Sequence, residues 1–308
     1  MKKFLGNYST MLILVIGCLI IPFKSEYFLT RINLENIIRQ SAIIGIMACG
    51  AVPVLLSGNI DISIGALLGL SGVLSAKLFD LGAPIILVFI IPVLTTMLIS
   101  LGNSILITKF QIHPFIITLG VMYVVRGFIY VITQEETFTN IAYPILVLGS
   151  GSIYSIPILS IILFTLALVM YIFIHKTRTG IYIQAVGGNV QTAREWGLNP
   201  KILTNLVFVI SGMFTGLAGI FNTGRMLSVE AQVGVGFEFQ VIGAFVIGGG
   251  VLFAGEGSVL KTLLGVFVFS IINNGMNLLQ ISPFIQLITR GMIIIFVIGM
   301  SLFFRQQN

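Results

Sequence analysis

Long apolar runs cover almost the whole chain and are separated by short stretches that are polar or contain glycine and proline. A helix needs about 20 apolar residues to cross the roughly 30 Å hydrocarbon core of a bilayer, and several runs approach that length without an internal charge. The runs are continuous instead of alternating at every second position, which disfavours a membrane β-barrel. The pattern predicts about ten transmembrane helices, at residues 10–23, 41–57, 62–79, 84–107, 114–132, 156–174, 202–222, 240–253, 258–279 and 284–304.

The composition agrees with a membrane protein. Apolar residues make up 57% of the chain, against roughly 45–50% in soluble domains. Many of the 34 glycines lie inside apolar runs, as expected where the backbones of membrane helices approach closely or break. No stretch is polar, serine-rich or proline-rich enough to link two folded units. We therefore expect an all-α, polytopic helical membrane bundle in which residues 1–308 form a single domain.

The distribution of basic residues predicts the orientation. Lys2 and Lys3 precede an apolar run that resembles a signal peptide, but no small-residue cleavage motif follows, so this run is expected to remain as the first span. With a cytosolic start, most basic loop residues fall inside and both termini are cytosolic, as the positive-inside rule favours. Residues 26–40 suit either a short amphipathic segment on the outer surface or an ordinary connector. The basic residues on the predicted inside are Lys2, Lys3, Lys109, Lys176, Arg178, Arg194, Lys201 and Arg305.

One long polar stretch, residues 175–201, interrupts the apolar pattern with the sequence HKTRTGIYIQAVGGNVQTAREWGLNPK. Asn189 is a residue type that caps a helix start and the Asn-Pro pair at 199–200 ends one, so a short helix through Arg194 and Trp196 is expected. Such a helix is too short to be stable alone in water and must pack against its own spans or a partner. Arginine and tryptophan are typical interface anchors, which indicates a cytosolic docking loop.

An acidic residue, Asp61, lies between two apolar runs in LLSGNIDISIGALLGLS. Ionisable residues inside a membrane usually face a cavity or cap a helix break. Gly58, Asn59 and Ser63 beside it are residue types found where a helix stops and restarts, so we favour a broken helix whose second part Asp61 caps. A carboxylate that binds a proton or the substrate stays open as the alternative.

A second candidate break lies in EFQVIGAFVIGGGVLFAGEGSVLKTLLG, where glycines surround a short polar turn. The segment GEGSVLKT comes close to the phosphate loop G-x-x-x-x-G-K-[ST], but Leu260 replaces the second glycine, whose absent side chain allows backbone N–H groups to approach phosphate. We therefore expect a non-helical turn near Gly255, buried in protein, instead of a nucleotide site.

Four segments together, GNIDISIGALLGLSG, HPFIITLGVMYVVRG, RTGIYIQAVGGNVQTAREWGLNP and VIGGGVLFAGEGSVLKTLLG, resemble the permease subunit of ribose-type monosaccharide ABC importers. The resemblance covers nearly the whole chain. It implies a multi-pass protein of the bacterial inner membrane that pairs with a second permease copy, identical or paralogous. It further implies a cytosolic ABC ATPase that holds ATP and magnesium, and an extracytoplasmic sugar-binding protein. The cargo would be a ribose-like sugar, with autoinducer-2 or a branched-chain amino acid as alternatives within related permeases.

The resemblance also assigns roles to residues. The family's coupling helix, which sits in a cleft of the ATPase, corresponds here to Gly187, Gly188, Asn189, Ala193, Arg194, Trp196 and Gly197. The translocation core corresponds to Gly58, Asn59, Asp61, Ser63, Gly65, Gly248, Gly249, Gly255 and Gly257. No catalytic residue, metal ligand or cofactor is expected on this chain itself.

Two rival functions have weaker support in the sequence. A self-powered secondary transporter or channel often shows paired intramembrane carboxylates, and here Asp61 is the main isolated candidate. An enzyme is disfavoured because no Ser-His-Asp, Cys-His or metal-ligand cluster is visible. The net charge of +6 is scattered between spans, so nucleic-acid binding is not expected. Arg126 and Arg290 fall inside predicted spans and must reach the interface or find partners.

Overall fold

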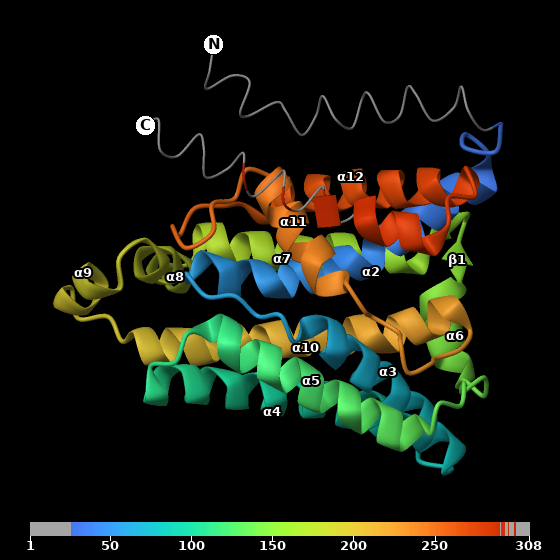
Figure 1. Cartoon of the computed structure of the whole chain (residues 1–308), viewed down its shortest axis with the longest axis horizontal. Coiled ribbons are helices and arrows are strands. Elements are labelled where there is room, and N and C mark those ends of the chain that lie inside the picture. Colours follow the sequence, from blue (N-terminus) through green and yellow to red (C-terminus); the bar gives the residue numbers. More distant parts are fainter. Residues whose placement is uncertain (1–25, 290, 293–294, 296–298, 300–308) are drawn as a thin grey trace.

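The protein is an antiparallel helical bundle (Figure 1), seen in a computed structural model that describes residues 26–289, 291–292, 295 and 299. The expected span 10–23 lies outside the described residues, as does most of the expected span 284–304. The helices are α2 (Arg31–Leu56), α3 (Ile64–Asp80), α4 (Ile85–Phe110), α5 (Pro114–Thr133), α6 (Tyr143–Ser150), α7 (Ile158–Lys176), α8 (Arg178–Gly188), α9 (Val190–Glu195), α10 (Pro200–Met226), α11 (Phe237–Ile247) and α12 (Val259–Leu278).

Six of these helices are long and apolar enough to cross a membrane, counted over the described part of the chain: α2, α4, α5, α7, α10 and α12. The prediction of a helical membrane bundle is therefore confirmed at that level. One short antiparallel pair, β1 (Ser152–Ile153) with β2 (Ile156–Pro157), departs from a purely helical fold. This hairpin connects α6 to α7 outside the long helices.

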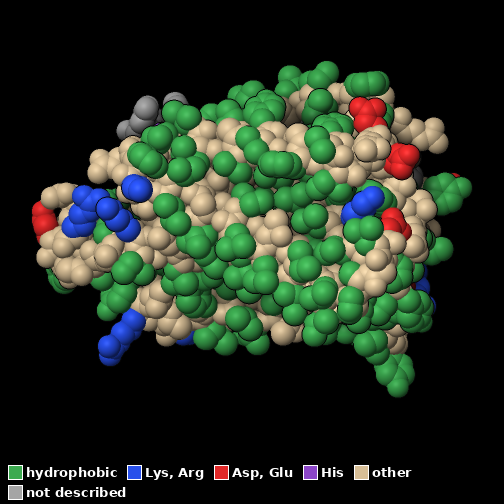
Figure 2. Space-filling view, turned by 90° about the horizontal axis from the view of Figure 1, so that it is seen from below, with side chains coloured by type: hydrophobic (Ala, Val, Ile, Leu, Met, Phe, Trp, Pro, Cys, Tyr) green, Lys and Arg blue, Asp and Glu red, His purple; other side chains and the backbone are tan. Residues whose placement is uncertain are grey.

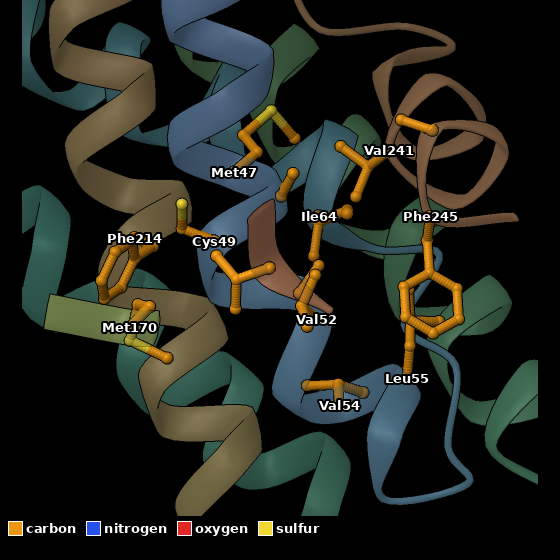
Figure 3. Packing of buried hydrophobic residues seen from close by; sticks show 14 of the residues in the cluster. Met47, Cys49, Val52, Val54, Leu55, Ile64, Met170, Phe214, Val241 and Phe245 are labelled. Atoms are coloured by element: carbon orange, nitrogen blue, oxygen red, sulfur yellow. The ribbon is translucent and has the colours of Figure 1, made fainter. Parts of the chain in front are cut away.

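The centre of the bundle is α2, whose most apolar window is 83% buried, whereas the corresponding windows of α4 and α5 are 22% and 17% buried. Helices that are apolar all round but exposed on most of their surface are those that face lipid. Figure 3 shows the side chains of Cys49 and Val52 on α2 between Phe214 on one side and Val241 and Phe245 on the other. The helix α2 thus lies at the core, and the other spans pack around it.

Close helix contacts depend on small residues, as expected in lipid, where no hydrophobic force drives helices together. A methyl group added to Gly212 of α10 would lie 2.6 Å from the carbonyl oxygen of Thr96 on α4. On the neighbouring face, the Ser71 hydroxyl of α3 donates a hydrogen bond of 2.6 Å to the carbonyl of Gly216. One helix, α10, therefore packs tightly against two neighbours through glycine positions.

Two expected boundaries need correction, and one helix was not expected. The helix expected from residue 41 begins at Arg31, capped by Thr30, so most of residues 26–40 form its first turns instead of a surface segment or connector. Its polar side chain Asn33 is buried by a reciprocal amide pair with Asn274 of α12, at 3.0 and 2.7 Å. The span expected at 240–253 ends at Ile247, because three glycines follow it. The helix that was not expected is α6.

The charged side chains visible on the surface in Figure 2 lie towards the two ends of the bundle, and apolar side chains form a band between them. We call these the α9 end and the β1 end after the elements found there in Figure 1. The α9 end is mainly basic and the β1 end mainly acidic. Described charged residues of the α9 end are Lys109, Lys176, Arg178, Arg194, Glu195, Lys201, Glu256 and Lys261; those of the β1 end are Glu26, Arg31, Glu35, Arg39, Lys77, Asp80, Glu135, Glu136, Arg225 and Glu230.

Candidate functional site

The polar loop at 175–201 folds into two short helices, α8 and α9, before α10 begins. The side-chain oxygen of Asn189 accepts a hydrogen bond of 3.0 Å from the Thr192 backbone N–H, which confirms Asn189 as the cap of the expected short helix. Asn199 in turn accepts from the Lys201 N–H at 3.1 Å and caps α10. The starts of α9 and α10 are therefore each capped by an asparagine.

The short helix α9 projects from the bundle at the left of Figure 1. Ala193 is buried against the protein, whereas Arg194 is exposed and Trp196 is 83% exposed. Gly197 follows with φ of +77°. No atom lies within 4 Å of the position that a β-carbon would occupy on this glycine. A largely exposed tryptophan beside an arginine, at a basic end of the molecule, is the arrangement expected of a docking surface.

The chain between α2 and α3 is non-helical and reverses direction, so it joins two antiparallel helices instead of interrupting one (Figure 1). Gly58 has φ of +76° at this turn. Asp61 accepts hydrogen bonds from the Ser63 backbone N–H at 2.9 Å and from the Ser63 hydroxyl at 2.6 Å, and the Asn103 amide donates to that hydroxyl at 3.1 Å. Asp61 thus organises the start of α3 from a buried position.

The second expected break is a turn between α11 and α12 that contains an isolated bridge between Val251 and Glu256. Gly249 and Gly255 have positive φ values of +80° and +70°. The Phe245 ring fills the space beside Gly257, where an added methyl group would lie 2.5 Å from the ring. This turn returns the chain at the α9 end of the bundle (Figure 1).

Both breaks approach the end of α8 closely enough for backbone atoms to be in contact. A methyl group added to Gly187 would overlap the carbonyl oxygen of Leu56 and lie 2.9 Å from the Gly58 nitrogen. One added to Gly255 would overlap the carbonyl oxygen of Gln184 and lie 3.2 Å from the Gly187 carbonyl carbon. We call Gly58, Gly187 and Gly255 the glycine junction, since three segments far apart in the sequence meet there without side chains.

Comparison with known proteins gives the family. Residues 33–298 match the family described as "Branched-chain amino acid transport system / permease component". The chain is 34% identical to the ribose import permease protein RbsC of Bacillus subtilis (strain 168), over 96% of this chain and 91% of that protein. It is also 34% identical to the D-allose transport system permease protein AlsC of Escherichia coli (strain K12), over 97% and 92% of the two chains.

A third relative is the galactose/methyl galactoside import permease protein MglC of Escherichia coli (strain K12), at 30% identity over 96% and 93% of the two chains. The chain belongs to the permease family whose model matches residues 33–298, and it resembles these import permeases. No solved structure gave a significant match. With its apolar helices, the permease is a multi-pass protein of the inner membrane, and its family role is transport.

The structure brings together only part of the residues that the sequence predicted for the permease's translocation core. Gly188 and Gly257 lie beside the glycine junction, and Asn59 follows it directly along the chain. Gly65 lies elsewhere, on α3, where an added methyl group would overlap the Glu238 carboxylate. A methyl group added to Gly249 would meet open space, whereas Gly248 packs against the backbone of α12.

Sequence reasoning missed the group around Arg126, inside α5. Its guanidinium donates to the carbonyls of Val233 at 2.7 Å and Ala231 at 3.4 Å, in the non-helical segment that leads to α11. The half-buried arginine lies within electrostatic range of Glu238, which is buried. Backbone carbonyls at membrane depth need donors. The signal in the sequence was an arginine within a span and an irregular stretch after α10, but nothing linked the two.

Proposed function

We propose that the permease is the membrane subunit of an ATP-driven ABC importer that carries a monosaccharide, a ribose-like sugar in the first instance. The observation that carries this proposal is identity of about one third with sugar import permeases over nearly the full length of both chains.

The choice among sugars is open within this proposal. Identity is 34% both to a ribose permease and to a D-allose permease, so overall similarity does not separate the two. Few charged residues lie inside the bundle, which suits a neutral, hydroxyl-bearing cargo that serine, threonine and asparagine groups can bind without burying net charge. Autoinducer-2 and, from the family description, a branched-chain amino acid are the alternative cargoes.

The proposed topology places the α9 end in the cytosol. Among the residues that the structure describes, basic residues outnumber acidic ones at this end and acidic residues outnumber basic ones at the β1 end, which is the asymmetry that the positive-inside rule describes. On this topology the full chain has about ten spans and two cytosolic termini. The β1 end would then receive sugar from an extracytoplasmic binding protein.

The proposed partners follow from the family role. A second permease copy, identical or paralogous, would complete the pathway, and a cytosolic ABC ATPase holding ATP and magnesium would supply the energy. The exposed pair Arg194 and Trp196 on α9 supports ATPase docking at this end. The permease itself would bind no cofactor.

The glycine junction suggests how ATPase movement reaches the pathway. An effector changes a conformational equilibrium only through contacts that differ between the two states. Because Gly187 touches the backbones of both Leu56 and Gly58, a displacement of α8 and α9 must be passed to the end of α2 and the break that follows it. Gly255 extends the same contact to the turn before α12. We propose that this transfer opens and closes the pathway in alternating access.

Reconstitution tests the function directly. The permease, its ATPase and a sugar-binding protein are incorporated into proteoliposomes, and uptake of labelled ribose, allose, galactose, autoinducer-2 and leucine is measured. We expect ATP-dependent uptake of one monosaccharide and none when ATPase or binding protein is omitted. Uptake that persists without the ATPase and collapses with the proton gradient would instead establish a secondary transporter.

A further inference from the structure

A cavity of about 350 Å³ lies at the α9 end. Its walls come from five places in the chain: the break after α2, the end of α4, the α8–α9 region, the start of α10, and Phe253 in the turn between α11 and α12. A second, more open hollow adjoins it and shares Gln111, Arg194, Pro200 and Lys201. This hollow is lined otherwise by residues 197–199, so the cavity is open beside the exposed end of α9.

The charged groups that line the cavity, Arg194 and Lys201, are both positive. Among the described residues, neither forms an ion pair; the ion pairs found there join Arg31 and Arg39 to Glu35, at the β1 end. Two cations without a counter-ion around one hollow produce a positive potential that attracts an anionic group. The cavity is therefore suited to accept negative charge.

The floor of the cavity is formed by the first break and by two members of the glycine junction, Gly58 and Gly187. Ser57, Gly58 and Asn59 line it together with Gly187. The Asn59 amide donates to the Ser57 hydroxyl at 2.9 Å and to the Ser57 carbonyl at 3.2 Å, which fixes this part of the wall. A group that enters from the α9 side thus reaches the backbone of the break as well as the two cations.

We propose that this cavity receives an acidic side chain of the ATPase partner. The carboxylate would lie between Arg194 and Lys201, and its stem would rest against the first break. The inference deepens the proposed function and depends on it. Charge complementarity favours an acidic protein group, and the exposed Trp196 beside the opening provides the apolar contact that commonly surrounds such a charged anchor. The contact would connect the ATPase to the break without passing through α8.

The test measures the affinity of the ATPase for the permease in nanodiscs of neutral lipid. Arg194→Gln and Lys201→Gln are each expected to raise Kd by at least about tenfold, as for loss of one partner of an enclosed charge pair. Lys176→Gln and Arg178→Gln, which remove exposed charges from the same end but outside the cavity, are expected to change Kd by less than about threefold. Thermal melting of each variant shows that it is folded.

Charge exchange identifies the partner group. Acidic residues on the docking face of the ATPase are changed singly to lysine, and at least one is expected to restore binding to the Arg194→Glu permease. The inference would be overturned if all four glutamine variants changed the Kd equally, or if Arg194→Gln and Lys201→Gln left the Kd unchanged. So would the failure of every charge exchange, or effects that arise only when anionic lipid is added, which would assign the cavity to a lipid headgroup.

The outcomes separate this inference from the proposed function. If wild-type permease shows ATP-driven uptake but the cavity variants bind the ATPase normally, only the inference fails. If no ATPase binds or drives wild-type uptake, the proposed function fails, and the inference fails with it.

Discussion

Replacing Gly187 with alanine should separate the ATPase-docking loop from the first break. The added methyl group would overlap the Leu56 carbonyl oxygen and lie 2.9 Å from its carbonyl carbon. Two carbon atoms normally stay at least about 3.5 Å apart, so α8 and the end of α2 must separate by about 0.6 Å or more. Both contacts are backbone, which cannot rotate away as a side chain does. Overpacking of this kind costs about 1–3 kcal/mol.

Gly188→Ala is the matched control. An added methyl group at Gly188 has its nearest neighbour, the carbonyl oxygen of Ala254, at an ordinary 3.7 Å. Both glycines lie at the end of the same helix, and positive φ values are absent from both. The gain in helix propensity, about 0.5–1 kcal/mol, is thus common to the two variants. The difference in stability between the two variants therefore measures the contact of residue 187 with Leu56 and Gly58.

The assay compares thermal melting, ATP hydrolysis and sugar uptake in proteoliposomes that contain the complete transporter. We expect Gly187→Ala to melt at a lower temperature than Gly188→Ala. Uptake per ATP hydrolysed should fall by roughly fivefold or more, the lower end of a coupling free energy of about 1–3 kcal/mol. Wild-type melting and uptake in Gly187→Ala would refute the close contact. A lower melting temperature with unchanged uptake per ATP would show that the junction stabilises the fold but does not transmit motion.

Three further predictions rest on other contacts. Thermal melting should show a larger loss of stability in Gly255→Ala than in Gly249→Ala, because both glycines have positive φ but only Gly255 contacts another segment. Equal losses in the two variants would mean that backbone strain alone accounts for them. The Asp61 side chain accepts hydrogen bonds at the start of α3, so Asp61→Asn should keep ATP-driven uptake, whereas Asp61→Ala should lose about 1 kcal/mol of stability. Abolished uptake in a stable Asp61→Asn protein would favour the alternative in which the carboxylate binds a proton or the substrate. A double-mutant cycle of Asn33→Ala and Asn274→Ala should give a coupling energy of about 0.6–1.7 kcal/mol by reversible unfolding in detergent, and additive losses would contradict the paired amides.

Local features were predictable from the sequence because they depend on neighbouring residues. The capping asparagine at 189 acts over three positions, and its hydrogen bond to Thr192 is the one that the residue type and spacing predict. Most span centres were predicted correctly for the same reason, since hydropathy is a local average. Helix boundaries were predicted less accurately where a polar side chain is hydrogen-bonded to a residue far away in the sequence. Asn33 lies in a segment that the sequence left outside the helix, and its burial depends on hydrogen bonds with Asn274.

The glycine junction could not be predicted from the sequence. Gly58 and Gly255 were singled out at turns, where backbone freedom alone is a sufficient reason for glycine, and Gly187 as part of the coupling helix that the resemblance implies. Gly187 has no positive φ, so its need to be glycine comes entirely from Leu56 and Gly58, more than a hundred positions away. The pairing of Arg126 with the Val233 carbonyl was hidden for a similar reason, because a carbonyl is present at every position and gives no sequence signal.

The position of the junction has a physical consequence for coupling. A side-chain contact between α8 and the breaks could absorb a small movement by changing rotamer, but a contact between backbones cannot. Non-helical backbone within a membrane protein must also stay covered by protein or water, so the two breaks cannot simply separate from α8 and remain exposed to lipid. Any state in which α9 moves therefore requires either a matching shift of Gly58 and Gly255 or the entry of water at the junction. The cavity beneath Arg194 borders this same place, which makes it the point where water or a partner side chain can replace the lost contact.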